Sequence, residues 1–266
     1  MNVGWHGVLM LVAIVVATWL TWRLAVRSGI SAEFVYISAF WIVLLGLIGA
    51  RVIHVLDNLD VYGDDPGRIL AFWKGGLSWY GGLLGGLVGG FVSTRINKIS
   101  LWRFADVVAP AGILGLSIGR IGCTINGDAY GTPTGLPWGL VYTHPDAYAD
   151  LFVAGHPAPV YEIIWNLMVF GILWRLKGRL KPDGSLFLAM VAMYSFGRFF
   201  ISWVREEPAV LGPLHQAHII SLVLFVGAVT LLAYWKVGWV RRETPEEIPS
   251  GNESIDVNEQ EQNQEY

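Results

Sequence analysis

The chain has 266 residues, of which 54% are hydrophobic and only 15% are charged, and its formal net charge is −3. Soluble domains carry about 25% charged residues, so this composition excludes an ordinary soluble globule and favours an integral membrane protein. The aromatic content of 13% excludes a disordered chain, and the slightly acidic balance gives no basic surface for nucleic acid. A single cysteine excludes an internal disulfide and any zinc site built from several cysteines.

Seven apolar runs are each long enough to cross a bilayer as a helix, which takes about 20 residues. They predict an all-α membrane protein with spans at about 5–22, 34–56, 77–94, 104–121, 159–175, 184–204 and 216–237. The third run is rich in glycine (GGLLGGLVGG), and small residues let helices approach closely in lipid. Arg23 and Arg27 follow the first run instead of preceding it, so we do not expect a cleaved signal peptide.

The distribution of Lys and Arg predicts the orientation in the membrane. With seven spans, most basic residues lie on one face, after the first, third, fifth and seventh spans. These residues are Arg23, Arg27, Arg95, Lys98, Arg103, Arg175, Lys177, Arg179, Lys181, Lys236, Arg241 and Arg242. Because short loops rich in Lys and Arg stay in the cytoplasm, we expect the N-terminus outside and the C-terminus inside.

The remaining segments define the expected domain organisation. We expect one transmembrane domain at 1–242, with a small irregular extracytoplasmic head at about 122–158, where Asn-Gly and Gly-Thr-Pro turn signals cluster. Residues 243–266 are polar and acidic with almost no apolar content, which predicts a disordered cytoplasmic tail.

Three arginines, Arg51, Arg120 and Arg198, lie within or at the ends of apolar runs. Arginine at membrane depth usually marks a function, although a long side chain can also extend to the interface, which is the alternative for Arg51. We place Arg120 at the end of the fourth span, where its planar set of donors suits a phosphate at the level of the headgroups. Arg198 supplies a second cation from the sixth span. The alternative for both is a structural pair with a carboxylate such as Asp128.

Six short motifs resemble, in order, those of the prolipoprotein diacylglyceryl transferase family, bacterial enzymes that attach lipid to lipoprotein precursors. They lie at residues 5–7 (WHG), 49–53 (GARVI), 78–82 (SWYGG), 119–131 (GRIGCTINGDAYG), 156–162 (HPAPVYE) and 198–208 (RFFISWVREEP). The resemblance covers nearly all of residues 1–240, and the seven-span topology with an external N-terminus agrees with that of the family.

The resemblance implies a specific reaction in the bacterial plasma membrane. A family member takes the diacylglyceryl group from phosphatidylglycerol, joins it to the thiol of a lipobox cysteine in a prolipoprotein, and releases glycerol phosphate. No metal or organic cofactor is implied. The family's essential arginines correspond to Arg120 and Arg198, which would hold the phosphate and stabilise charge on the leaving group. Other motif residues are expected to contact substrate, namely Tyr194, Gly81, Gly82, Asn126 and Gly131.

Five positions depart from the family's usual residues. His6 stands in place of Tyr, Tyr80 in place of His, Cys123 in place of Asn, and both Asp128 and Ser202 in place of Glu. These departures leave open a second interpretation, a divergent relative that binds lipid without lipobox transfer. A transporter is a third interpretation, since buried arginines and glycine-rich helices also fit a conduit, but the chain has no internal repeat of the kind that transporters show.

The reciprocal exchange at His6 and Tyr80 leads to a hypothesis about the general base. Activating a thiol needs a base with a pKa near neutral, and imidazole fits, so we expect His6 to be the base if both side chains face one cavity. In the alternatives, His6 is an interfacial residue, or Asp128 is the base with a pKa raised from its usual value of about 3.9. We expect Cys123 to be a small apolar side chain, because the attacking sulfur belongs to the substrate.

Other titratable residues near the outer face are expected to have structural roles. Glu162 is expected at a helix start, where a carboxylate interacts favourably with the helix dipole. Four histidines, His6, His156, His215 and His218, fall on the outer side. Their spacing does not require a metal ion, so we expect no metal site.

Overall fold

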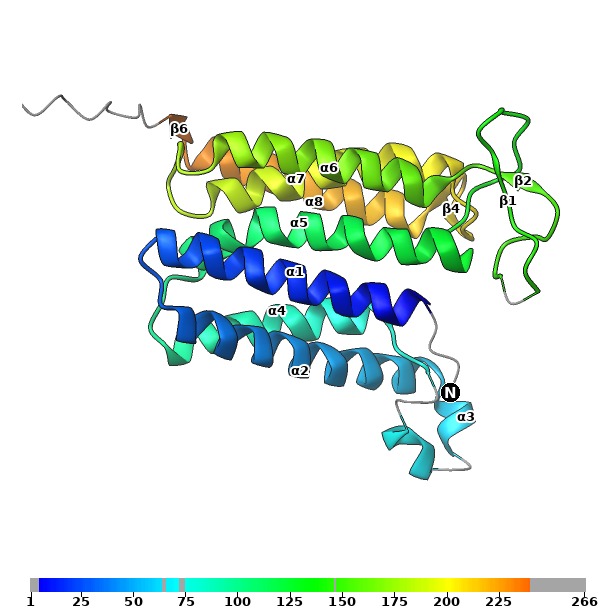
Figure 1. Cartoon of the computed structure of the whole chain (residues 1–266), viewed down its shortest axis with the longest axis horizontal. Helices are drawn as coiled ribbons and strands as arrows, with labels where there is room; N and C mark the ends of the chain where they lie inside the picture. The colour runs from blue at the N-terminus through cyan, green and yellow to red at the C-terminus, as the bar shows by residue number, and fades with distance from the viewer. Residues whose placement is uncertain (1–4, 64–65, 72–74, 146, 240–266) are drawn as a thin grey trace, which may run out of the picture.

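The computed structural model describes residues 5–63, 66–71, 75–145 and 147–239. Within this part of the chain, seven long helices lie side by side, each reversing the direction of the one before it (Figure 1). They are α1 (Trp5–Arg27), α2 (Ala32–Asp57), α4 (Trp79–Ile96), α5 (Leu101–Asn126), α6 (Ala158–Leu176), α7 (Ser185–Ile201) and α8 (Gln216–Tyr234). The tail predicted at 243–266 lies outside the described residues.

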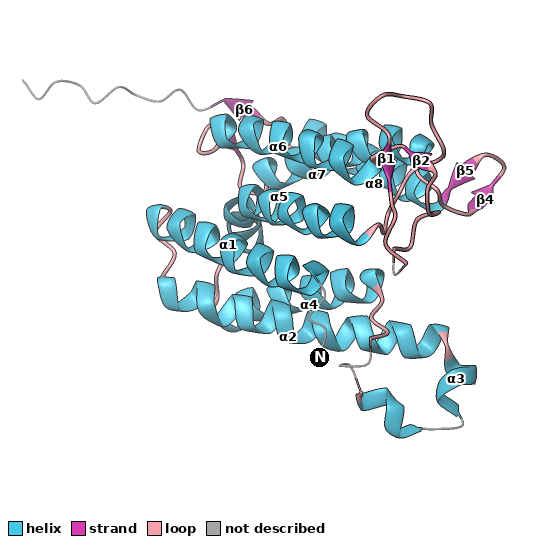
Figure 2. Cartoon of the chain, turned by 45° about the vertical axis from the view of Figure 1, so that its right-hand side comes forward, coloured by secondary structure: helices cyan, strands magenta, loops and turns pink. Residues whose placement is uncertain are grey.

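Short elements join the helices at the two ends of the bundle (Figure 2). One end carries α3 (Leu59–Gly63), the 3-10 helix η1 (Pro66–Leu70), the antiparallel pair β1 (Leu140–Val141) and β2 (Ala154–Gly155), and the hairpin of β4 (Ala209–Leu211) and β5 (Leu214–His215). At the other end, β3 (Leu180–Lys181) pairs with β6 (Gly238–Trp239). The head expected at about 122–158 therefore shares its end of the bundle with two further segments.

The helices form two groups that meet at α5. On one side α1 packs against α5, and α2 packs against α4; on the other side lie α6, α7 and α8 (Figure 1). One apolar core, which includes Leu24, Phe34 and Phe104, joins α1, α2 and α5. A second core joins α5, α6 and α7 through Ile113, Leu173 and Leu186.

A carboxylate fixes α7 against α5 at the end of the bundle opposite the head. Asp106 of α5 accepts hydrogen bonds from the backbone N–H groups of Gly184 and Phe187, both at 2.8 Å. These two donors belong to the start of α7, where backbone N–H groups have no partner within the helix. Gly184, the residue before α7, has no side chain that could cap the helix. Asp106 of α5 supplies the cap in its place.

Among the described residues, five helical segments are long and apolar enough to cross a membrane by length and composition. They are Trp5–Arg27, Ala32–Asp57, Leu101–Asn126, Ser185–Val204 and Gln216–Tyr234, the fourth being α7 continued by the 3-10 helix η3 (Ser202–Val204). The expected seven spans also include α4 and α6. Glycine lowers the hydropathy of α4, and α6 contains the buried polar residues Glu162 and Asn166.

Glycines set the distance between α2 and α4. A Cβ atom added to Gly85 would meet the backbone carbonyl of Leu45, and one added to Gly89 would lie 2.5 Å from the carbonyl oxygen of Trp41. Both backbones therefore come close enough that no larger residue fits. This contact matches the expectation that the glycine-rich run serves helix packing in lipid.

The fourth expected span, at 104–121, is longer in the structure, because α5 continues to Asn126. Gly127 then ends the helix with a φ of 73°, a left-handed conformation that glycine adopts readily. Arg120 consequently lies inside the helix and not at its end. The helix tolerates Gly119 and Gly122 because α1 packs directly on this face.

We expect Gly85→Ala to separate α2 from α4 and to lower the stability of the folded protein by about 1–3 kcal/mol, the usual effect of overpacking. Thermal unfolding of the purified protein in detergent measures this change. Gly90→Ala is the matched control, because its Cβ atom would lie 3.8 Å from the side chain of Ile42, an ordinary contact. Equal melting temperatures for the two variants would contradict the packing argument.

Candidate active site

Three arginines from different elements surround one buried carboxylate. Glu162, in the second turn of α6, is 2% exposed. Its Oε2 lies 2.5 Å from Nε of Arg120, and its Oε1 accepts hydrogen bonds from Nη1 of Arg198 at 2.8 Å and Nη1 of Arg205 at 3.1 Å. The two arginines expected to share a phosphate site, Arg120 and Arg198, thus contact the same carboxylate.

A second carboxylate completes this arginine cluster, which we define as Arg120, Arg198, Arg205, Glu162 and Glu207. Oε1 of Glu207 lies 2.9 Å from Nη2 of Arg198 and 2.9 Å from Nε of Arg205. Burial, followed by repulsion from Arg198, lowers the pKa of the Arg205 guanidinium below its usual value. Three guanidinium groups face two carboxylates in this cluster, so it carries one excess positive charge and favours an anionic ligand.

The local sequence explains how α6 and α7 bring these groups together. Gly197 has no side chain, and a Cβ atom there would meet the indole of Trp165 on α6. The Trp165 Nε1–H donates a hydrogen bond of 2.9 Å to the carbonyl of Met193, one turn earlier on α7. Arg198 follows Gly197 directly and therefore faces the start of α6. Tyr194, one turn before Arg198, lies beside Arg120.

Two members of the cluster were not expected from the sequence, and one had been given another role. Glu162 was expected to interact with the dipole at a helix start, but it is buried among three arginines. Arg205 and Glu207 follow the sixth expected span, and the sequence alone assigns them no role. The signal lay in the motif at 198–208, which contains Arg198, Arg205 and Glu207 within ten positions. These three residues come together only because η3 folds the segment after it back onto Arg198.

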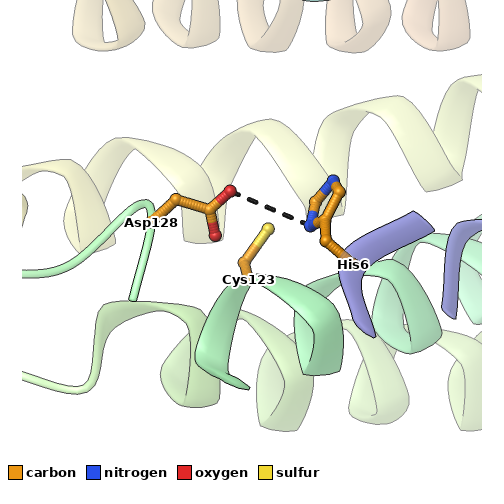
Figure 3. Close-up of side chains that lie close together, drawn as sticks. All are labelled: His6, Cys123 and Asp128. Atoms are coloured by element: carbon orange, nitrogen blue, oxygen red, sulfur yellow. Dashed lines mark ion pairs between the residues drawn. The ribbon is translucent and has the colours of Figure 1, made fainter. Parts of the chain in front are cut away.

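A second cluster lies next to Arg120 and consists of His6, Cys123 and Asp128. Figure 3 shows the Cys123 thiol pointing into the space between the His6 imidazole and the Asp128 carboxylate. Nδ1 of His6 and Oδ2 of Asp128 are 3.8 Å apart. Nη1 of Arg120 lies 3.7 Å from Sγ of Cys123. Asp128 therefore pairs with His6, and Arg120 pairs with Glu162 in place of the suggested Asp128.

The close approach of α1 to α5 makes this second cluster possible. A Cβ atom at Gly122 would lie 3.2 Å from Cα and 3.3 Å from Nδ1 of His6. The glycine thus lets the first turn of α1 lie against the last two turns of α5. Asp128 follows one residue after Gly127 ends the helix, so the chain turns back toward Cys123.

The structure places other predicted site residues in packing positions. Gly131 pairs with Arg205 in an isolated antiparallel bridge, and a Cβ atom there would meet the carbonyl of Val204. A Cβ atom on Gly81 would meet the carbonyl of Gly49 on α2. Gly131 thereby holds the segment that carries Arg205, and Gly81 belongs to the contact between α2 and α4.

The three remaining predicted residues lie at helix ends near the head. Tyr80 is at the start of α4 and is 42% exposed. Among the described residues, no hydrogen bond or ion pair joins Tyr80 to His6, so the shared cavity stays a prediction. Gly82 follows on the same turn of α4, and its added Cβ would lie 3.6 Å from Cβ of Ala50. Asn126 is the last residue of α5 and is half-buried.

Arg51 lies outside the arginine cluster and is buried against another part of the chain. Its side chain is 6% exposed, and its guanidinium donates hydrogen bonds to four backbone carbonyls of the loop before α4. These carbonyls belong to Arg68, Ile69, Gly75 and Gly76, at 2.5 to 2.8 Å. The arginine therefore joins η1 and the residues just before α4 to α2.

The histidines expected on the outer side also have local partners. Nδ1 of His156 lies 3.3 Å from the hydroxyl of Tyr161. The side chain of His218 accepts a hydrogen bond of 3.1 Å from the backbone N–H of His215, which forms part of the N-terminal cap of α8. Ring Nδ1 of His215 lies 3.1 Å from the carbonyl oxygen of Ser202.

An apolar groove of about 380 Å³ opens on the surface of α6 and α7, the two helices that carry Glu162 and Arg198. Its lining includes Tyr161, Trp165, Phe196, Gly197 and Phe200. Tyr161 and Gly197 directly adjoin Glu162 and Arg198 in the sequence. An apolar groove beside a buried positive charge suits a ligand with an apolar chain and an anionic group.

Comparison with known proteins matches residues 1–234 to the family model described as prolipoprotein diacylglyceryl transferase. The chain belongs to this family. A phosphatidylglycerol–prolipoprotein diacylglyceryl transferase of a Nostoc species is 34% identical over 95% of this chain and 92% of its own length. Proteins of the same name from Thermosynechococcus vestitus and Clostridioides difficile are 37% and 34% identical, over 82% and 88% of this chain and 83% and 91% of their own lengths.

We expect Glu162→Gln to destabilise the protein, because it leaves three buried guanidinium groups with a single carboxylate. Loss of one partner of a buried ion pair costs about 3–5 kcal/mol, and thermal unfolding in detergent measures it. Glu206→Gln is the matched control, because Glu206 is exposed and adjoins the cluster only in sequence. If both variants unfold at the temperature of the unmodified protein, Glu162 does not hold the cluster together.

Proposed function

We propose that this protein transfers the diacylglyceryl group of phosphatidylglycerol to the lipobox cysteine thiol of a prolipoprotein and releases glycerol phosphate. The curated relatives carry the name of this activity, and the family match spans nearly all of the described helices. The observation that carries the proposal is the excess positive charge of the arginine cluster, which lies buried beside an apolar groove.

The phosphate of the lipid fits the arginine cluster by charge and geometry. Guanidinium groups present planar pairs of donors that match phosphate oxygens. Arg120 and Arg198 are 15% and 13% exposed, so the phosphate would meet them where water is mostly excluded. Donors fixed in such a site stabilise developing charge strongly because they need not reorient during the reaction.

In the proposed reaction the sulfur of the substrate attacks the glycerol carbon that bears the phosphate. The thiol proton passes to solvent water, a carbon–sulfur bond forms, and the carbon–oxygen bond breaks with its electron pair on the phosphate oxygen. Arg120 and Arg198 would neutralise that oxygen, so that glycerol phosphate becomes an adequate leaving group. The acyl chains would remain in the groove of α6 and α7, which faces the lipid.

The proposed membrane topology has seven spans, with the head outside and the C-terminus in the cytoplasm of a bacterial cell. The loops that follow α1, α4 and α6 lie at the end of the bundle opposite the head (Figure 1). They carry Lys98, Lys177, Arg179 and Lys181, and Arg27 is the last residue of α1 at the same end. Basic loops on one face support this orientation.

We expect Arg198→Lys to reduce transfer by about 100-fold, because lysine keeps the charge but loses the paired donors that stabilise the leaving group. The assay incubates purified protein with phosphatidylglycerol and a lipobox peptide and measures the mass gained by the peptide. Arg175→Lys, at the exposed last turn of α6, is the matched control. If the unmodified protein binds the lipid but forms no product, the proposed reaction is wrong.

We expect a green fluorescent protein fused after the C-terminus to fluoresce in bacterial cells, and alkaline phosphatase fused after Asp150 to be active. Green fluorescent protein folds in the cytoplasm, whereas alkaline phosphatase needs the oxidising exterior for its disulfides. Fluorescence and enzyme activity in cells check the orientation. The reverse pattern would place the head in the cytoplasm and overturn the topology.

A further inference from the structure

The cluster of His6, Cys123 and Asp128 brings three different metal-binding groups to one point. Their ligand atoms all lie within 4.8 Å of one another. They come from the first turn of α1, from the last two turns of α5, and from the segment after Gly127 (Figure 3). Sequence spacing alone could not reveal this set, because His6 is more than a hundred positions from the other two.

Two buried atoms of this cluster lack a hydrogen-bond partner. Among the described residues, Nδ1 of His6 and Oδ1 of Asp128 are inaccessible to solvent and form no hydrogen bond. A buried polar atom without a partner is unfavourable and calls for a missing ligand, ion or water. Both atoms belong to the side chains that flank the Cys123 thiol.

The separations fit a tetrahedral metal centre. With metal–ligand bonds of about 2.0–2.3 Å, neighbouring ligand atoms in such a centre lie about 3.3–3.7 Å apart. Nδ1 of His6 and Oδ2 of Asp128 are 3.8 Å apart, and no two ligand atoms of the set are more than 4.8 Å apart, so side-chain rotations would have to bring the three atoms slightly closer together. A mixed set of sulfur, nitrogen and oxygen suits zinc, whereas magnesium and calcium prefer oxygen alone.

The three residues are also three of the five departures from the family's usual residues. Tyr, Asn and Glu at positions 6, 123 and 128 would not provide a sulfur and an imidazole nitrogen. In this chain His6 and Cys123 replace weaker zinc ligands by stronger ones, and Asp128 keeps a carboxylate at its position. Because they meet at one point in the structure, a single shared role explains them together.

We propose that His6, Cys123 and Asp128 bind one zinc ion, and that its fourth position takes the thiol of the substrate. The second part of this inference rests on the proposed transfer reaction. Zinc centres with three protein ligands keep a position open for water or substrate. His6, expected from the sequence to be a general base, would instead be a metal ligand.

The geometry places the bound thiol where the reaction needs it. Arg120 contacts both clusters, since its Nη1 lies 3.7 Å from Sγ of Cys123 and its Nε lies 2.5 Å from Glu162. A thiol on the metal would thus lie beside the phosphate held by the arginine cluster. Zinc deprotonates a coordinating thiol; the proton goes to solvent, and the sulfur then forms its bond to the glycerol carbon as glycerol phosphate leaves.

Metal binding can be tested without the transfer assay. The full-length protein, purified in detergent, is loaded with zinc, dialysed, and analysed by atomic mass spectrometry for zinc per chain. We expect about one zinc ion for the unmodified protein and background levels for His6→Ala, Cys123→Ser and Asp128→Asn. His144→Ala, an exposed histidine of the head, is the matched control and should keep the metal. Zinc content that none of the three substitutions lowers would overturn the proposal.

Cobalt reports on the ligands and on the substrate. Cobalt(II) bound to a thiolate absorbs in the near ultraviolet, so this band should be present in the unmodified protein and absent in Cys123→Ser. A lipobox peptide with a free thiol should strengthen the band, and the same peptide with serine for cysteine should not. Equal spectra with the two peptides would refute substrate coordination, whatever the transfer assay shows.

The triple variant His6→Tyr, Cys123→Asn and Asp128→Glu separates this inference from the proposed function. It restores the residues usual in the family, and it should fold without binding zinc. We also expect chelation to lower transfer by the unmodified protein at least tenfold, and added zinc to restore it. Full transfer by metal-free unmodified protein would sink the zinc proposal and leave the transferase intact. Stoichiometric zinc binding without any transfer product would leave the metal site intact and overturn the proposed transferase activity.

Discussion

A guanidinium group buried in a membrane protein needs an anion, or several carbonyl oxygens, beside it. Here one carboxylate, that of Glu162, meets three such groups, so that α5, α6, α7 and the segment after η3 are joined at a single point. Because each guanidinium needs a negative partner, the contacts with Glu162 determine where the ends of these four elements lie. It also leaves the cluster one negative charge short, and this deficit is what a phosphate can supply.

The same requirement explains why glycine occupies two positions close to the buried charges. Gly197 and Trp165 pack without an intervening side chain, which brings Arg198 to the start of α6. Gly122 lets His6 reach the end of α5, next to Arg120. Glycines at these positions are thus part of the electrostatic arrangement, because any side chain would separate charges that need to be close.

Much of the helical architecture was predictable from hydropathy. The seven expected spans correspond to the seven long helices, and the arginines at 120 and 198 stood out because charge is rare in apolar runs. The role of Glu162 was not predictable, since a carboxylate near a helix start has a simpler explanation. Its burial depends on which face of α6 meets α5, and hydropathy does not fix that rotation. The meeting of His6 with Cys123 likewise depends on contacts between distant segments.

The four carbonyl contacts of Arg51 are what hold the described parts of the connection between α2 and α4. The loop before α4 has little apolar core of its own, with Ala71 its only buried hydrophobic residue among those described. One side chain from α2 instead binds carbonyls of η1 and of Gly75 and Gly76, which precede α4. A substitution of this single side chain would remove all four hydrogen bonds at once, so η1 and the residues before α4 share one anchor on α2.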